Sequence, residues 1–206
     1  MNLKSLQRRA ILLSLGVGLA ATLTGCFGSA PPVPKEQYFR LIAGTDPAPA
    51  THPLSGIVEV PLFQAEGVMG ERPLLFTNDG GIKLEQRNYA YWTDPPPAML
   101  RDQLVAFLRA AKLAGQVVPS ELRVAAQYRI EGRIRRLEQT TGGANGGVVA
   151  LELALIDKAT DGIVASGTYE IAKGASGENI ADAVHALNAA LNEIFAKFAA
   201  DLDQRG

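Results

Sequence analysis

Few side chains in this 206-residue chain could carry covalent or metal chemistry. It has one cysteine, Cys26, and two histidines, His52 and His185. The histidines are far apart, and neither has a Cys, Asp or Glu at the spacing that metal ligands show. We therefore expect both to be surface residues or residues satisfied by hydrogen bonds, and we expect no metal and no cofactor.

The one thiol stands in the stretch LTGCFGS, directly after an apolar run. The chain opens with MNLKSLQRR, which carries three basic residues and no acid, and continues with AILLSLGVGLAATLTG. A basic start before a short apolar run is typical of a secretory signal, whereas a transmembrane helix needs about 20 apolar residues. We predict a signal peptide over residues 1–25. A free buried cysteine in an exported protein is the alternative interpretation of Cys26.

The end of this run, Leu23-Thr24-Gly25-Cys26, resembles the lipobox of bacterial lipoproteins. In that class the signal is cut before the cysteine, and the thiol and the new amino group receive acyl chains such as palmitate. The resemblance implies a lipid anchor at Cys26, which would hold the protein on a membrane without spanning it. Phe27 follows the cysteine where an Asp would favour the inner membrane in Gram-negative bacteria. For such a source we expect the outer membrane, with the protein facing the periplasm.

Composition limits the function classes. The formal net charge is −1, and removing Lys4, Arg8 and Arg9 with the signal brings it to about −4. A nucleic-acid-binding domain would need a basic face, so we expect no nucleic acid. The apolar content of 47% predicts a globular fold. After a linker at residues 26–36, rich in proline, residues 37–206 are long enough for a single domain with its own core.

Catalytic motifs are missing from the sequence. There is no G-x-S-x-G elbow, and the stretch GGANGG lacks the Lys of a phosphate-binding loop and joins two predicted strands. The run Arg133–Arg136 could bind lipid phosphates, but its alternating pattern favours a solvated strand face. We therefore expect the protein not to be an enzyme.

Hydrophobic periodicity predicts a twisted, mostly antiparallel sheet with two main helices, a mixed α/β or α+β fold. Turn signals, proline positions and alternation place the strands, the first of them with Tyr38 and Leu41 as core anchors. One predicted helix follows Pro97 and closes at Gly115, and the other begins after a cap at Ser176 or Gly177. The predicted strands cover residues 37–43, 56–63, 72–78, 82–92, 116–119 and 125–139, and two more flank Asp161-Gly162.

The only tryptophan, Trp92, stands where a predicted strand gives way to a helix, in NYAYWTDPPPAMLRDQL. One interpretation is a core aromatic that fixes this corner. The other is a contact for a partner protein, because Trp and Tyr are common anchors of interfaces. Under the second interpretation we predict that Tyr91, Trp92 and Asp94 bind a partner.

Two stretches together resemble the ABC-type transport auxiliary lipoproteins, also called the paraquat-inducible lipoprotein family. They are VEVPLF and LLFTNDGGIKLEQRNYAYWTDPPPAMLRDQLVAFLRAA, and the resemblance covers roughly residues 38–198. One departure is Asp94, where the family pattern suggests Glu. The resemblance implies a mixed α/β fold without catalytic residues. It also implies partners that contain MCE domains, within an ABC system that moves lipid or other hydrophobic molecules between the inner and outer membranes.

The sequence is also compatible with another class of envelope lipoprotein. A lipoprotein that regulates a cell-wall enzyme, or that assembles a secretion complex through strand edges, would show the same anchor and element order. In either case a small, singly anchored domain with an exposed sheet edge would gain avidity as a homo-oligomer, and we predict such an assembly on membranes.

Overall fold

A computed structural model describes residues 32–204, except residues 45 and 79. The predicted signal peptide, Cys26 and most of the linker lie outside the described residues. Residues 35–206 form one compact unit. None of the helices in the described part of the chain combines the length and the hydrophobicity needed to cross a membrane.

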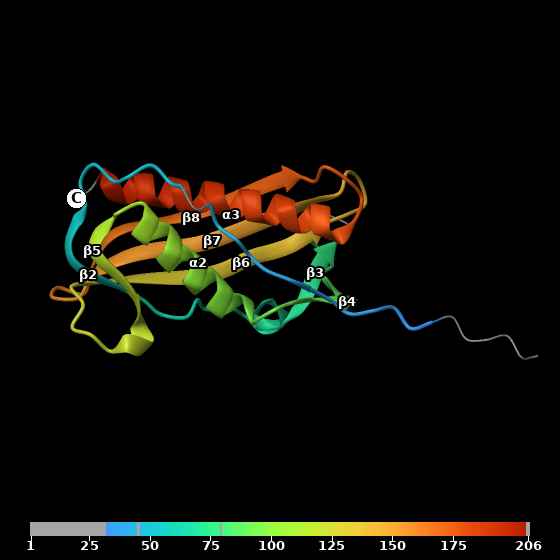
Figure 1. The fold of residues 1–206 in the computed structure, drawn as a ribbon, viewed down its shortest axis with the longest axis horizontal. Coiled ribbons are helices and arrows are strands. Elements are labelled where there is room, and N and C mark those ends of the chain that lie inside the picture. Colours follow the sequence, from blue (N-terminus) through green and yellow to red (C-terminus); the bar gives the residue numbers. More distant parts are fainter. Residues whose placement is uncertain (1–31, 45, 79, 205–206) are drawn as a thin grey trace, which may run out of the picture. The chain divides into compact units, whose positions relative to one another are not determined.

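Eight strands form one curled sheet in the described part of the chain (Figure 1). The five strands from the first half of the chain are short, and all join the same side of the long strand β6. They are β1 (Gln37–Phe39), β2 (Leu54–Val60), β3 (Pro73–Thr77), β4 (Glu85–Trp92) and β5 (Ala114–Pro119). β3 and β4 form an antiparallel hairpin, while β1 pairs with β4, and β2 with β5, in parallel.

The second half of the sheet is an antiparallel meander of three long strands. They are β6 (Tyr128–Thr140), β7 (Gly146–Asp157) and β8 (Gly162–Gly174). Apolar and polar residues alternate along much of β6 and β8, which suits a sheet with one covered and one exposed face. β7, between them, is mostly apolar and buried. The long antiparallel ladders and the two helices confirm the predicted fold class.

Parallel pairing to β6 organises the first half of the sheet. Val58 of β2 is opposite Tyr128, Gln64 is opposite Arg133, and Phe76 of β3 is opposite Gln139. The chain from β2 to β3 therefore follows one side of β6 from its beginning to its end.

Both helices cover the same face of the sheet (Figure 1). Helix α2 (Pro96–Ala110) packs on β5, and helix α3 (Ile180–Asp203) packs on β6, β7 and β8. The rings of Phe107 and Phe195 meet edge to face, with centroids 5.7 Å apart, where the helices touch. The core lies between the helices and this face, and its largest fully buried side chains include Trp92, Phe195 and Phe198. Two 3₁₀ turns, η1 (Gly67–Gly70) and η2 (Ser120–Leu122), complete the fold.

The predicted ends of the helices were wrong. Helix α2 ends at Ala110, and Lys112 takes the left-handed conformation (φ 52°) that lets the Leu113 amide donate to the carbonyl of Leu108 at 3.1 Å. Gly115 lies in β5 instead. Helix α3 is capped by Asn179, whose side chain accepts from the Asp182 amide at 2.9 Å in a capping box, and not by Ser176 or Gly177.

One of the two predicted anchors of the first strand was also wrong. Leu41 is buried, but the side chain of Tyr38 is 53% exposed. Phe39 lies opposite the buried Trp92 in the sheet, so its neighbour Tyr38 must face solvent.

The loop between β6 and β7, predicted as a hairpin tip, also fixes the start of α3. The Asn145 amide group donates to the carbonyls of Gly177 (2.7 Å) and Asn179 (3.1 Å). Its oxygen accepts from the Gln139 amide at 2.7 Å, and Gln139 in turn accepts from Arg87 at 2.8 Å. This chain of buried and half-buried polar groups connects β4, β6 and α3, so the helix starts at a defined place on the sheet.

Candidate functional site

The corner between β4 and α2 holds the three residues predicted to bind a partner, and the structure gives them different environments. Trp92 is buried, in agreement with a core aromatic, and cannot contact a partner in this conformation. Tyr91 is half-buried and Asp94 is exposed at the start of α2. Contact through Tyr91 or Asp94 stays a prediction.

Backbone hydrogen bonds hold this corner in place. The Trp92 amide donates to the carbonyl of Arg72 at 2.7 Å, and the Thr93 amide donates to the carbonyl of Phe39 at 2.9 Å. The Arg72 Nε donates to the Trp92 carbonyl at 3.1 Å. No side chain caps α2 in the structure, so Asp94 does not serve that purpose. The proline at the start of the helix instead supplies a residue without an N–H group, as predicted.

Two tyrosines outside the core lie beside this corner. The rings of Tyr38 and Tyr91 have centroids 5.8 Å apart, and the Arg72 guanidinium lies over the Tyr38 ring at 5.5 Å from its centroid. The Tyr38 hydroxyl donates to the Glu36 carboxylate, which raises the pKa of Tyr38 above its ordinary value. Tyr38 and Arg72 were missed as surface residues of interest because the sequence does not show which strands are neighbours.

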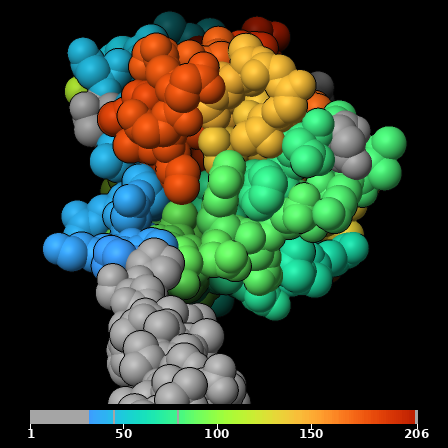
Figure 2. Space-filling model, turned by 90° about the vertical axis from the view of Figure 1, so that its right-hand side faces the viewer, coloured from blue at the N-terminus to red at the C-terminus, as the bar shows by residue number. Residues whose placement is uncertain are grey.

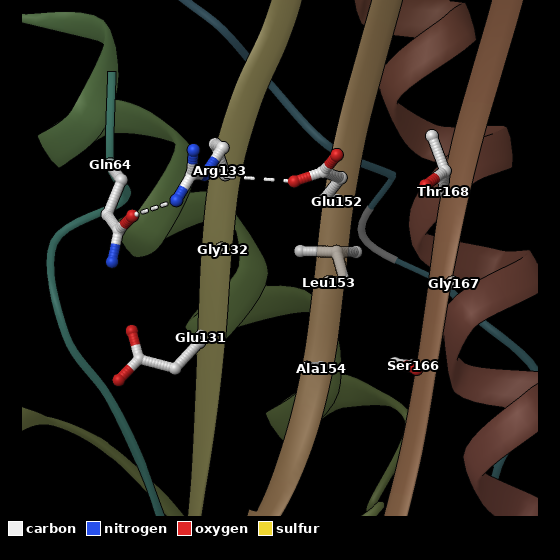
Figure 3. Close-up of a pocket in the computed structure, with 10 residues that line it drawn as sticks. All are labelled: Gln64, Glu131, Gly132, Arg133, Glu152, Leu153, Ala154, Ser166, Gly167 and Thr168. Atoms are coloured by element: carbon white, nitrogen blue, oxygen red, sulfur yellow. Dashed lines mark hydrogen bonds and ion pairs between the residues drawn. The ribbon is translucent and has the colours of Figure 1, made fainter. Parts of the chain in front are cut away.

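A second candidate site is a hollow of about 360 Å³ on the face of the sheet that the helices leave uncovered (Figure 3). Strands β6, β7 and β8 form its floor, and Gln64 lies at its edge. Its polar lining side chains are Gln64, Glu131, Arg133, Glu152, Ser166 and Thr168.

The charged side chains of the hollow form ion pairs. Arg133 donates to the Gln64 side chain at 2.9 Å and lies 3.7 Å from the Glu152 carboxylate (Figure 3). Glu152 also pairs with Arg135 at 3.3 Å, and Glu131 pairs with Arg129 at 2.9 Å. Glu131 and Glu152 thus each have an arginine partner. The two carboxylates are therefore not arranged as a free acid and base.

The arginine run is therefore part of a network of ion pairs on the strand face, in which the Glu138 side chain is buried. Arg136 pairs with Glu138 at 2.7 Å and with Glu170 at 2.9 Å. Each arginine between Arg133 and Arg136 therefore has a carboxylate partner. The sequence could not show these partners, because Glu152 and Glu170 come from the two following strands. The sequence showed only that polar residues alternate along these strands.

The histidines do not take part in either site. The His52 amide donates to the Asp203 carboxylate at 2.5 Å, beside Thr51, and His185 is exposed on α3. Within the described ranges, no group of His, Cys, Asp and Glu side chains could hold a metal ion. The arrangement of both sites suits binding of a partner surface.

A family model described as "ABC-type transport auxiliary lipoprotein component" matches residues 42–199. This chain therefore belongs to that family, as the resemblance of its sequence predicted. A search among curated proteins found no match.

Solved structures share the fold. Protein XCC0632 from Xanthomonas campestris is 21% identical, with a TM-score of 0.68 over 79% of this chain and 92% of its own. An uncharacterised protein is 15% identical, with a TM-score of 0.66 over 81% of this chain and 98% of its own. The PelC dodecamer from Paraburkholderia phytofirmans is 17% identical over 78% of this chain and 94% of its own, with a TM-score of 0.47.

Proposed function

We propose that this protein is a lipoprotein anchored through Cys26 in the outer membrane, where it faces the periplasm and assists an ABC system. The system would contain MCE-domain proteins and move lipid or other hydrophobic molecules between the two membranes. The observation that carries this proposal is the family match over residues 42–199. The signal-like start and the Leu-Thr-Gly-Cys motif support the anchor.

Its work in that system is docking and not catalysis. The two described sites are surfaces with paired charges and exposed polar groups, which suits contact with another protein. The hollow over β6, β7 and β8 is our preferred place for the transporter partner, because it is concave and its charged groups are held by neighbours. Tyr91 and Asp94 are the remaining candidates at the corner.

A pull-down of the acylated full-length chain from its native envelope tests the function. Co-purification of an MCE-domain protein, or of an ABC permease and ATPase, supports the proposal. A cell-wall synthase or a secretin in their place would favour the alternative class of envelope lipoprotein.

The anchor has its own test. Cys26→Ser should yield an uncleaved or soluble precursor, because no thiol remains to be acylated. Mass spectrometry of the wild-type membrane fraction should find acyl chains on Cys26, and an unmodified Cys26 there would end the lipoprotein interpretation.

A substitution that fills the hollow tests the docking surface. Thr168 is exposed at the hollow, so Thr168→Trp should reduce recovery of the partner while the melting temperature hardly changes. Ala181→Trp, on the exposed side of α3, is the matched control. Equal recovery with both variants would place the partner elsewhere.

A further inference from the structure

Three of the five tyrosines of the chain lie at one place, where β1 pairs with β4. Tyr38 and Tyr91 are paired across the two strands, and Tyr89 lies two residues before Tyr91 on the same side of β4. Tyr38 is 53% exposed and Tyr89 is 40% exposed. Figure 2 shows this end of the molecule, where the N-terminal segment (blue) and the β3–β4 hairpin (green) lie side by side. We call Tyr38, Tyr89, Tyr91 and Arg72 the tyrosine surface.

Arg72 differs from the arginines of β6. Its guanidinium contacts the Tyr38 ring and the Trp92 carbonyl, and among the described residues it forms no ion pair with a carboxylate. Its remaining N–H groups are available to an oxygen-rich ligand. Lys35 and Arg40 add positive charge to the neighbouring segment, while Glu36, Glu71 and Asp94 add negative charge. The surface as a whole is therefore near neutral.

The chain keeps this surface within a short distance of the predicted anchor. Tyr38 comes twelve residues after Cys26, and an extended chain spans at most about 3.3–3.6 Å per residue, or roughly 40 Å in all. Prolines in this segment, Pro31, Pro32 and Pro34, favour extended backbone. A tether of this length gives a high local concentration of membrane, so even a weak contact would form.

We propose that the tyrosine surface rests on the headgroup layer of the membrane that holds the Cys26 acyl chains. Tyrosine rings are amphipathic and favour the boundary between hydrocarbon and water, where the hydroxyl stays hydrated. The free N–H groups of Arg72 donate to lipid phosphates. Because the surface is near neutral, phosphate of zwitterionic lipid suffices, and anionic lipid adds little. The contact fixes the orientation of the domain and rests on the acylation of Cys26 in the proposed function.

A fluorescent label can locate the surface relative to the bilayer. Since Cys26 is the only cysteine and is acylated in the proposed form, a second cysteine can be labelled selectively. The acylated full chain carrying Tyr89→Cys or Ile163→Cys is labelled and reconstituted in phosphatidylcholine vesicles with brominated acyl chains. Ile163 is 68% exposed near the start of β8. β8 starts at the end of the long strands that lies away from the β3–β4 hairpin (Figure 1).

We expect the label at position 89 to be quenched several-fold more than the label at position 163. Adding Tyr38→Ser and Arg72→Gln should reduce quenching at position 89 to the level at position 163. Arg123→Gln, at an exposed arginine in the loop between β5 and β6, is the matched control and should leave quenching unchanged. A thermal melt of each variant confirms that the fold is kept.

The outcomes separate the contact from the anchor. Protein that fails to float with vesicles refutes the lipoprotein proposal itself. Protein that floats with equal quenching at both positions overturns the membrane contact and leaves the anchor intact. If the tyrosine variants then lose the transporter partner in the pull-down, the surface binds protein, as predicted for Tyr91 from the sequence.

Discussion

At the scale of single residues, Trp92 is held from several sides. It is 1% exposed, and its backbone amide donates to the carbonyl of Arg72 while its carbonyl accepts from the Arg72 side chain. The amide of the next residue donates to the carbonyl of Phe39. It therefore ties together β1, β4 and the chain before β3. A side chain of this size in such a place contributes mainly by packing.

Trp92→Ala should lower the free energy of unfolding by about 3–5 kcal/mol, because the loss of a buried ring removes its contacts and leaves a cavity. Urea denaturation of the domain measures the change, and Ile163→Ala, at an exposed position, is the control. A Trp92→Ala variant as stable as the control would show that the ring is not part of the core.

Glu193 on α3 gives a prediction for pH. Lys173 and Lys197 both bond to its carboxylate, at 2.6 and 2.9 Å, and lower its pKa to about 2. This pKa is below the ordinary glutamate value of about 4.5. The two ion pairs of Glu193 therefore stabilise the fold fully above about pH 4.5. The stabilisation is lost as the pH falls from about 4.5 toward 2.

An NMR titration of the Glu193 side-chain carboxyl should show this low midpoint. Lys173→Gln should raise the midpoint, since Lys173 makes the larger contribution. Added salt should raise it too, because the group is exposed and the ion pairs are screened. A midpoint near 4.5 in the wild type would contradict the two ion pairs.

At the scale of elements, local patterns were enough for most strands and both helices. The alternation along β6 and the turn signals of the β3–β4 and β7–β8 hairpins are properties of neighbouring residues, so the sequence shows them directly. The helix ends are decided elsewhere. Lys112 adopts a left-handed conformation that is uncommon for lysine, and a Cβ at Gly115 in β5 would lie 3.1 Å from the carbonyl oxygen of Gly56.

The candidate sites were less predictable for a related reason. The neighbours of each strand are set by parallel pairings between segments far apart in the chain. β2 and β3 pair with β6, and β1 pairs with β4. The tyrosine surface and the partners of Arg133 to Arg136 exist only through these pairings. Trp92 could be placed at a corner from the sequence, but its burial needed the packing of α2 and the sheet.

Gly132 in the middle of β6 gives a prediction for an element. A Cβ atom at this position would lie 2.6 Å from the Phe63 ring, which is itself buried. Gly132→Ala should therefore destabilise the fold by about 1–3 kcal/mol through overpacking. Gly174→Ala, at the end of β8 where a Cβ would meet open space, should change stability little.

Urea denaturation of both glycine variants makes the comparison. Phe63→Leu should recover part of the loss in the Gly132→Ala background, because it makes room for the methyl group. No recovery, or equal stability of the two glycine variants, would show that Phe63 and Gly132 do not constrain each other.

At the scale of the whole molecule, β8 leaves one edge of the sheet open. In the described structure β8 pairs only with β7, and exposed strand edges are sites for association. We predict that membrane-bound copies form a homo-oligomer that covers this edge. Light scattering on residues 28–206 should detect it at high concentration, and crosslinking in membranes tests it with the partner present.

The crosslink can be placed at the edge itself. Residues 28–206 contain no cysteine, so Ile163→Cys gives a single thiol near the start of β8. Disulfide-linked dimers should form with this variant and not with Ala181→Cys on α3. A monomer in both assays would leave a single-copy tether.

The course of β2 and β3 along one side of β6 has a consequence for how fast the chain can fold. β6 and β7 can pair as soon as both exist, because only a short turn separates them. β2 and β3 must wait for a strand that begins at Tyr128, some seventy residues after β2 starts at Leu54. Contacts between such distant segments slow folding, because the intervening loop must close first. The β6–β8 meander is therefore expected to form the folding nucleus, and hydrogen exchange during refolding should protect it before β2 and β3.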